Sequence, residues 1–161
     1  MSAYTVRRAT VADAAIIATH RASMFRDMGE LPVAEVPAFE AATEPWIADR
    51  MARGDYLGWL VEYDARVVAG GGVLLSDLWP TPRIRRASRT AHVASMYTER
   101  EHRRRGLARL VVRAILDWCA TNAIELVTLR ASAEGQPVYE QLGFKPDPKT
   151  MRLFVAPAPQ H

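Results

Sequence analysis

Cysteine is almost absent from this chain, and its scarcity excludes several classes of site. The single cysteine, Cys119, cannot form an internal disulfide or contribute to a cysteine-cluster metal site. Its position beside an apolar helical pattern predicts an inert thiol in the core. We therefore expect no metal site.

Long hydrophobic runs and a secretory leader are also lacking. No apolar run reaches the roughly 18 to 20 residues that a membrane-spanning helix requires. The first residues, MSAYTVRRATVADAAIIATHR, place Asp13 before a short apolar patch and lack the basic-then-apolar order of a signal peptide. Together with the scarcity of cysteine, these absences favour a cytoplasmic protein that contacts no membrane.

The residues that are present suit a single folded unit with an uneven charge distribution. The chain has 161 residues, of which 49% are hydrophobic and 24% charged, and no repeat or internal linker interrupts them. We expect one domain over residues 1–156 and a loose tail over 157–161. Residues 26–55 carry seven acids against three arginines, whereas residues 83–113 carry ten arginines against two acids. The second region would attract polyanions.

Hydrophobic periodicity and turn residues predict a mixed α/β fold. The expected helices are 11–25, 44–53, 106–123 and 137–143, the expected strands are 4–9, 56–64, 65–76, 90–98, 124–132 and 150–155, and 26–39 and 78–89 are connections. Alternation along 56–64 predicts one buried face. The helix 106–123 carries an apolar stripe at i, i+3, i+4 and i+7 spacing, formed by Leu107, Leu110, Val111, Ala114, Ile115 and Trp118.

The turn RRRGLA, residues 103–108, joins a strand to the start of that helix. The first N–H groups of a helix have no intrahelical acceptor, and the helix dipole favours an anion there. Gly106 has no Cβ to block a ligand from the backbone. Arg103, Arg104 and Arg105 add charge-assisted donors, and no nearby group is expected to neutralise them. A pyrophosphate would satisfy all of these features together.

These residues give the chain a resemblance to the GCN5-related N-acetyltransferases. RRRGLA fits the Arg/Gln-x-x-Gly-x-Gly/Ala signature of that family, the strand before it ends in MYT, and VYEQLGF at 138–144 resembles its Tyr-x-x-x-Gly-Phe motif. The element order matches over nearly the whole chain. The resemblance implies a GNAT-like α/β fold with a mixed, mostly antiparallel sheet splayed at its centre and helices on both faces. It also implies an acyltransferase with acetyl-CoA as co-substrate.

The resemblance further carries binding roles onto matching positions. Backbone groups of the strand end would pair with the pantetheine arm, and the turn would bind the pyrophosphate. Ser132 stands where the family often has an asparagine that contacts the cofactor, and its reach is shorter. The predicted cofactor-binding residues are Met96, Tyr97, Thr98, Arg103, Arg104, Arg105, Gly106, Leu107, Ala108 and Ser132.

Two residues are candidates for the chemistry of acetyl transfer. Tyr139 would stand by the thioester sulfur, where a phenol of pKa about 10 can protonate a thiolate if it is positioned beside it. His92 occupies the strand position where some family members carry a catalytic glutamate, and its imidazole can accept a proton near neutral pH. Ordered water is the alternative base. A backbone N–H near Met96 or Tyr97 would meet the oxyanion.

The acceptor side is expected from residues 20–50 and the loop 76–90. Acidic residues near Asp27, Glu30 and Glu35 favour a cationic amine there, and the predicted substrate residues are Phe25, Asp27, Glu30 and Trp79. We expect direct transfer to a primary amine, either a small molecule or a peptide terminus, in a ternary complex. A non-catalytic acyl-CoA-binding module and an arginine-rich nucleic-acid-binding domain remain as alternatives, and a homodimer is left open.

Overall fold

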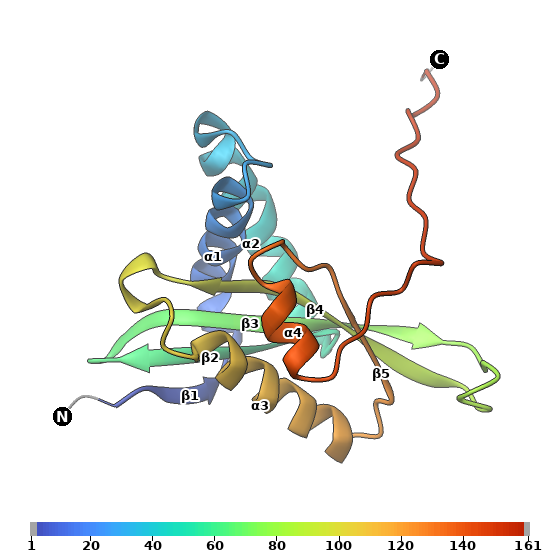
Figure 1. Cartoon of the computed structure of the whole chain (residues 1–161). Helices are drawn as coiled ribbons and strands as arrows, with labels where there is room; N and C mark the ends of the chain where they lie inside the picture. Colours follow the sequence, from blue (N-terminus) through green and yellow to red (C-terminus); the bar gives the residue numbers. More distant parts are fainter. Residues whose placement is uncertain (1–2, 160–161) are drawn as a thin grey trace.

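The computed structural model describes residues 3–159 and has a central sheet with helices on both faces (Figure 1). The helices and strands are β1 (Thr5–Arg8), α1 (Ala14–Asp27), α2 (Val36–Arg53), β2 (Tyr56–Tyr63), β3 (Arg66–Leu78), β4 (Ser88–Thr98), α3 (Leu107–Thr121), β5 (Leu126–Leu129) and α4 (Gln136–Gln141), with short 3-10 helices at Val11–Asp13, Val33–Glu35 and Arg100–His102.

The five strands lie side by side in chain order, from β1 to β5. Each pair from β1 to β4 is antiparallel, while β5 runs parallel to β4. Helix α3 makes the crossover that a parallel pair requires. The sheet is therefore mixed and mostly antiparallel, as predicted.

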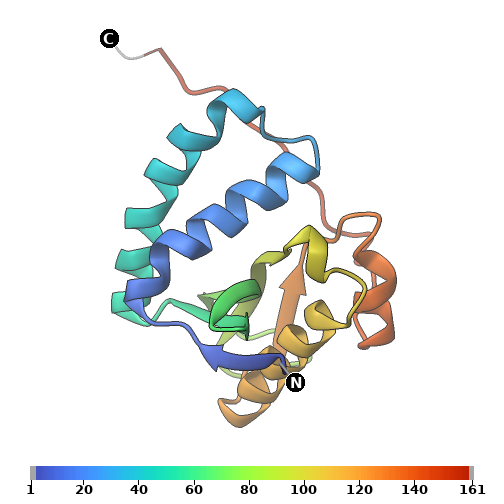
Figure 2. The same ribbon diagram turned by 90° about the vertical axis from the view of Figure 1, so that its left-hand side faces the viewer.

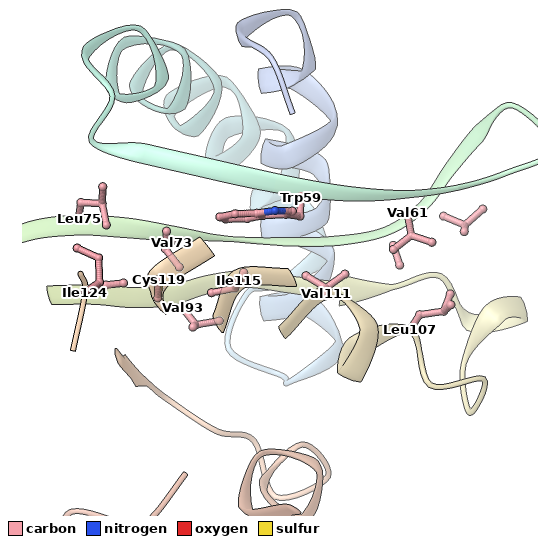
Figure 3. Packing of buried hydrophobic residues seen from close by; sticks show 13 residues of the cluster. Trp59, Val61, Val73, Leu75, Val93, Leu107, Val111, Ile115, Cys119 and Ile124 are labelled. Carbon is pink, nitrogen blue, oxygen red and sulfur yellow. The ribbon is translucent and has the colours of Figure 1, made fainter. Parts of the chain in front are cut away.

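Helix α3 covers one face of the sheet, and α1 and α2 cover the other (Figure 2). On the α3 side, Trp59 and Val61 of β2 belong to the same buried cluster as Val111 and Ile115 of α3 (Figure 3). The helix predicted over 106–123 is confirmed as α3. Its buried stripe differs from the predicted one, because it includes Val112 and Cys119 while Leu110 is 39% exposed. The buried thiol of Cys119 was predicted correctly.

The opposite face of β2 is buried as well. Tyr56 and Leu60 pack with Ile17 of α1 and Ile47 of α2 in a second buried cluster. The prediction of a single buried face was therefore wrong. A central strand covered by helices on both sides buries residues of both parities, so the alternation in the sequence marks only one of its two buried faces.

Helix α2 is much longer than the predicted helix 44–53, because it begins at Val36. Pro37 lies in its first turn, where a missing backbone N–H costs no hydrogen bond. The predicted bounds 44–53 place Pro45 near the helix start, whereas the structure places it inside the helix. Packing of α2 along α1 offsets the hydrogen bond that this proline removes. The predicted loop 26–39 is accordingly shortened from both ends.

The predicted last strand, 150–155, does not form in the described part of the chain. Its apolar side chains are between 80% and 94% exposed, namely those of Met151, Leu153, Phe154 and Val155. The segment leads away from the sheet (Figure 1). A β pattern forms a strand only where a partner supplies hydrogen bonds, and this segment reaches none. Of the tail expected at 157–161, residues 160–161 lie outside the described residues.

No helix in residues 3–159 is both long and apolar enough to cross a membrane.

Candidate active site

The sheet opens between β4 and β5. Strand β4 pairs with β3 along most of its length, but it pairs with β5 only from Thr90 to Val93. Strand β5 ends at Leu129, opposite Val93, and the chain then turns away toward α4 (Figure 1). Residues 94–98 of β4 therefore present backbone groups with no strand on that side. This is the splay expected from the resemblance.

A β-bulge lies at the start of this open edge. Ser95 has a φ of 58°, and the pairing with β3 shifts register between Gly70 and Gly72. A Cβ added at Gly71 would lie 2.0 Å from Sδ of Met96. Bulges redirect a strand and its side chains. The glycine between the two register positions leaves the room that the bulged residues need.

The turn after β4 presents free N–H groups, as predicted for an anion site. Arg104 and Gly106 both have left-handed φ angles, 60° and 77°. The first helical hydrogen bond of α3 runs from the N–H of Leu110 to the carbonyl of Gly106 at 3.0 Å. Within the described chain, the N–H groups of residues 104–109 have no hydrogen-bond acceptor. Such an array at a helix start suits a pyrophosphate.

Arg103 departs from the expectation that no nearby group neutralises the three arginines. Its Nη2 lies 2.7 Å from Oδ2 of Asp27, its Nε donates to the carbonyl of Thr98 at 2.9 Å, and its guanidinium lies 5.6 Å from the ring centre of Tyr97. The ion pair joins the turn to the end of α1. Arg103 therefore braces the turn, while Arg104 and Arg105 are exposed beside it.

A pocket of about 460 Å³ opens beside the splay. It brings together several predicted site residues from four regions of the chain, namely Phe25, His92, Met96, Ser132 and Tyr139. Most other lining residues are apolar or aromatic, which is typical of a small-molecule site. Of the predicted acceptor regions, residues 21–47 contribute to the lining and the loop 76–90 does not.

Tyr139 is placed by α4 with its ring edge-to-face against Phe144, at a centroid distance of 5.9 Å. Burial raises the pKa of Tyr139, so its phenol is protonated at neutral pH. The described residues offer its hydroxyl no hydrogen-bond partner, which leaves the proton available to a ligand. Nearby, the hydroxyl of Ser132 accepts a hydrogen bond from the Gly135 N–H at 3.1 Å. The hydroxyl proton of Ser132 can still be donated.

His92 lies on β4, with its Nδ1 2.8 Å from Oγ1 of Thr128 on β5. Burial lowers the pKa of His92, and the positive charges of Arg21 and Arg130 lower it further. The imidazole is therefore neutral at neutral pH, as a proton acceptor must be. Thr128 orients the ring across the last paired stretch before the splay.

Three predicted substrate residues lie outside the pocket. Asp27 is engaged by Arg103, Arg26 and Arg100, at 2.7 to 3.5 Å. Glu30 is exposed beyond the end of α1, and Trp79 is 82% exposed in the connection between β3 and β4. Among residues 3–159 no aspartate or glutamate lines the pocket, so the acids predicted for the acceptor side do not reach this cavity.

Sequence reasoning missed Arg21, which lines the pocket from α1. It stands four residues before Phe25, so the two side chains share a helix face, and its guanidinium lies 4.9 Å from the Phe25 ring centre. That spacing was the available signal. Trp46 of α2 and Tyr56 of β2 also line the pocket, and neither was predicted as a site residue.

Comparisons with known proteins agree with this geometry. A sequence profile of the acetyltransferase (GNAT) family matches residues 21–144. No curated protein matches the chain. A GCN5-related N-acetyltransferase from Ralstonia eutropha shares the fold with a TM-score of 0.85 at 24% identity, over 94% of this chain and 99% of that one.

Two further crystal structures have the same fold. A predicted acetyltransferase with acetyl-CoA from Clostridium acetobutylicum has a TM-score of 0.85 at 22% identity, over 94% of this chain and 96% of that one. A ribosomal-protein-alanine N-acetyltransferase from Brucella melitensis has a TM-score of 0.68 at 20% identity, over 95% and 100% of the two chains.

Proposed function

The chain belongs to the acetyltransferase (GNAT) family, and on that premise we propose that it transfers an acetyl group to a primary amine by direct attack in a ternary complex. Members of this family are acyltransferases that use acetyl-CoA as co-substrate. The finer proposal concerns the route of transfer and the residues that carry it.

The open edge of β4, running into the free N–H groups of the turn, is the observation that carries this proposal. Residues 94–98 offer unpaired backbone groups, to which the amides of a pantetheine arm can add as a strand does. The N–H groups of residues 104–109 lie at the end of that edge and suit the pyrophosphate. Gly106 leaves its surroundings open, because a Cβ there would have no atom within 4 Å. These features fit acetyl-CoA as the bound substrate.

The pocket residues then have distinct roles in the transfer. The ammonium of the acceptor loses a proton to His92, and the neutral nitrogen attacks the thioester carbon. A backbone N–H near Met96 or Tyr97 stabilises the negative oxygen of the intermediate. As the carbon–sulfur bond breaks, Tyr139 donates its proton to the departing thiolate. The attached nitrogen gives up its second proton to solvent, and solvent reprotonates the Tyr139 phenolate. Ser132 can donate a further hydrogen bond to the bound co-substrate.

A thiol-release assay with acetyl-CoA across a panel of amines tests the proposal. Direct transfer predicts amine-dependent release of free coenzyme A and initial-velocity lines that intersect. Parallel lines would instead indicate a covalent acetyl-enzyme. Tight coenzyme A binding without amine-dependent release would favour the non-catalytic acyl-CoA-binding module.

A further inference from the structure

The pocket carries positive charge, so it does not suit an acceptor with a second positively charged group. Arg21 and Arg130 are its charged lining residues, and among residues 3–159 no carboxylate lines it. A pocket with cationic groups and no acid attracts anions and disfavours further cations. The reacting amine is consumed in its neutral form, so the unpaired positive charge of the pocket is available to an anionic group.

Arg21 is the cation best placed for such a group. Its side chain is half-buried on the α1 side of the pocket and packs over Phe25. Its guanidinium has no hydrogen bond or ion pair within residues 3–159, whereas Arg26, Arg50 and Arg103 each lie within 4 Å of a carboxylate. Burial disfavours this charge and lowers the pKa of Arg21, a cost that the nearby Tyr56 offsets only in part. A bound anion would remove that cost.

Arg21 also lies close to the chemistry. Its charge acts on His92, and both residues line the same pocket as Tyr139. A guanidinium binds a carboxylate through two parallel hydrogen bonds, which fixes the orientation of the bound molecule as well as its position. An acceptor held there would have its amine directed from Arg21 toward the splay.

The remaining walls are mostly apolar. Phe25, Phe39, Trp46 and Leu74 line the same pocket as Arg21. Trp46 and Phe39 come from α2 and Leu74 from β3, so the apolar surface spans both the helical cover and the sheet. These walls suit an aliphatic or aromatic side chain.

We propose that the acceptor is an amine that bears a carboxylate and an apolar body, with Arg21 binding the carboxylate. This inference rests on the proposed acetyl transfer and narrows its acceptor. A free amino acid with a large apolar side chain has the required chemistry. A peptide terminus does not, because its α-carboxylate is converted to an amide.

The test compares amines that differ only in the carboxylate. Phenylalanine, phenylalaninamide and 2-phenylethylamine share the same aromatic side chain, and only phenylalanine has a carboxylate. The amine of phenylalaninamide is less basic than that of phenylalanine, and the amine of 2-phenylethylamine is more basic, so basicity alone cannot explain a preference over both. A β-amino acid with the same ring covers a longer distance between amine and carboxylate. We expect kcat/KM for the preferred amino acid to exceed that of both analogues at least tenfold.

The variant Arg21→Gln should lower this preference at least tenfold, mainly through KM. Arg53→Gln is the matched control, since Arg53 is an exposed arginine of α2 that pairs with Asp49 at 3.0 Å. The control should keep the preference. If the unmodified protein turned over the analogues that lack a carboxylate as well as the amino acid or better, the inference would be overturned. An unchanged preference in Arg21→Gln would overturn it as well. A preference for a phosphate-bearing amine over every carboxylate would overturn it too.

Binding of N-acetylphenylalanine, measured by calorimetry with coenzyme A present, separates this inference from the proposed function. We expect binding that is lost in Arg21→Gln and kept in Arg53→Gln. If no amine is acetylated, the proposed transfer fails, and this binding measurement still decides whether Arg21 holds a carboxylate. Absence of binding in the unmodified protein would refute the assignment.

Discussion

Two glycines with the same backbone conformation allow a controlled test of the turn after β4. Gly106 has φ 77° and ψ 14°, and Gly54, at the end of α2, has φ 77° and ψ 13°. A Cβ at either position would meet no atom within 4 Å. Substitution by glutamate therefore adds the same left-handed strain and the same charge at both sites. Only Gly106 lies at the proposed pyrophosphate site.

The backbone strain expected at the two sites is equal, although the helix dipole favours a carboxylate at the start of α3 and disfavours one at the end of α2. The effects on binding should differ far more. A non-glycine residue in the left-handed region costs roughly 1–2 kcal/mol. For a domain of this size, each kcal/mol lowers Tm by about 2–4 °C, so both variants should melt slightly earlier. A carboxylate about 4 Å from a phosphate charge is repelled by about 1 kcal/mol in water and about 4 kcal/mol near a protein surface. Since about 1.4 kcal/mol is a tenfold change, Gly106→Glu should weaken coenzyme A binding at least tenfold.

Isothermal titration calorimetry with coenzyme A, together with melting curves, measures both quantities. The loss in Gly106→Glu should shrink as salt is added, because salt screens exposed charges. Gly54→Glu should bind as the unmodified protein does. Unchanged affinity in a folded Gly106→Glu variant would refute the assignment of this turn to the pyrophosphate.

Three further predictions concern titratable groups in and near the pocket. In Tyr139→Phe the ring contact with Phe144 is kept and only the hydroxyl is lost, so turnover should fall about 100-fold or more with little change in Tm; near-normal steady-state turnover would exclude Tyr139 as the acid. Because the pKa of His92 is lowered, the acid limb of the pH–rate profile should lie below the ordinary histidine range. Arg21→Gln removes a positive charge near His92 and should move this limb to higher pH. An unaltered pH–rate profile in His92→Ala would assign the base to water. His20 is buried, its Nε2 has no hydrogen-bond partner within residues 3–159, and burial lowers its pKa to about 4. Between pH 6.5 and 4 the unfolded state therefore binds more protons than the folded state, so about 3 kcal/mol of folding stability should be lost as pH falls through that window. The urea unfolding midpoint of His20→Gln should depend less on pH than that of the unmodified protein, and equal pH dependence in both would contradict this.

The residues that carry the family resemblance could be located from the sequence because their roles depend on local structure. The turn 103–108 needs a glycine at a left-handed position and free N–H groups at a helix start, and both requirements act within a few residues. The helix that follows was predicted from its own periodicity. Tyr139 was located by a short motif on a short helix.

Local pattern also misled where a distant element supplied the deciding contact. Residues 150–155 were predicted to form a strand, but in the described part of the chain no neighbouring strand pairs with them. Pro45 indicated a helix start, yet α2 continues through it because α1 packs alongside.

The sequence alone determined where a turn suited to an anion follows a central strand, since glycine, helix start and arginines are adjacent. It did not determine which charges remain unpaired. Asp27 and Arg103 are 76 positions apart and form an ion pair. This pair engages an aspartate that was predicted for the acceptor site and an arginine that was predicted for the cofactor site. Arg21, by contrast, is left without a carboxylate within the described chain, inside the pocket. Charge pairing depends on distances of a few ångströms between elements that only the tertiary fold brings together.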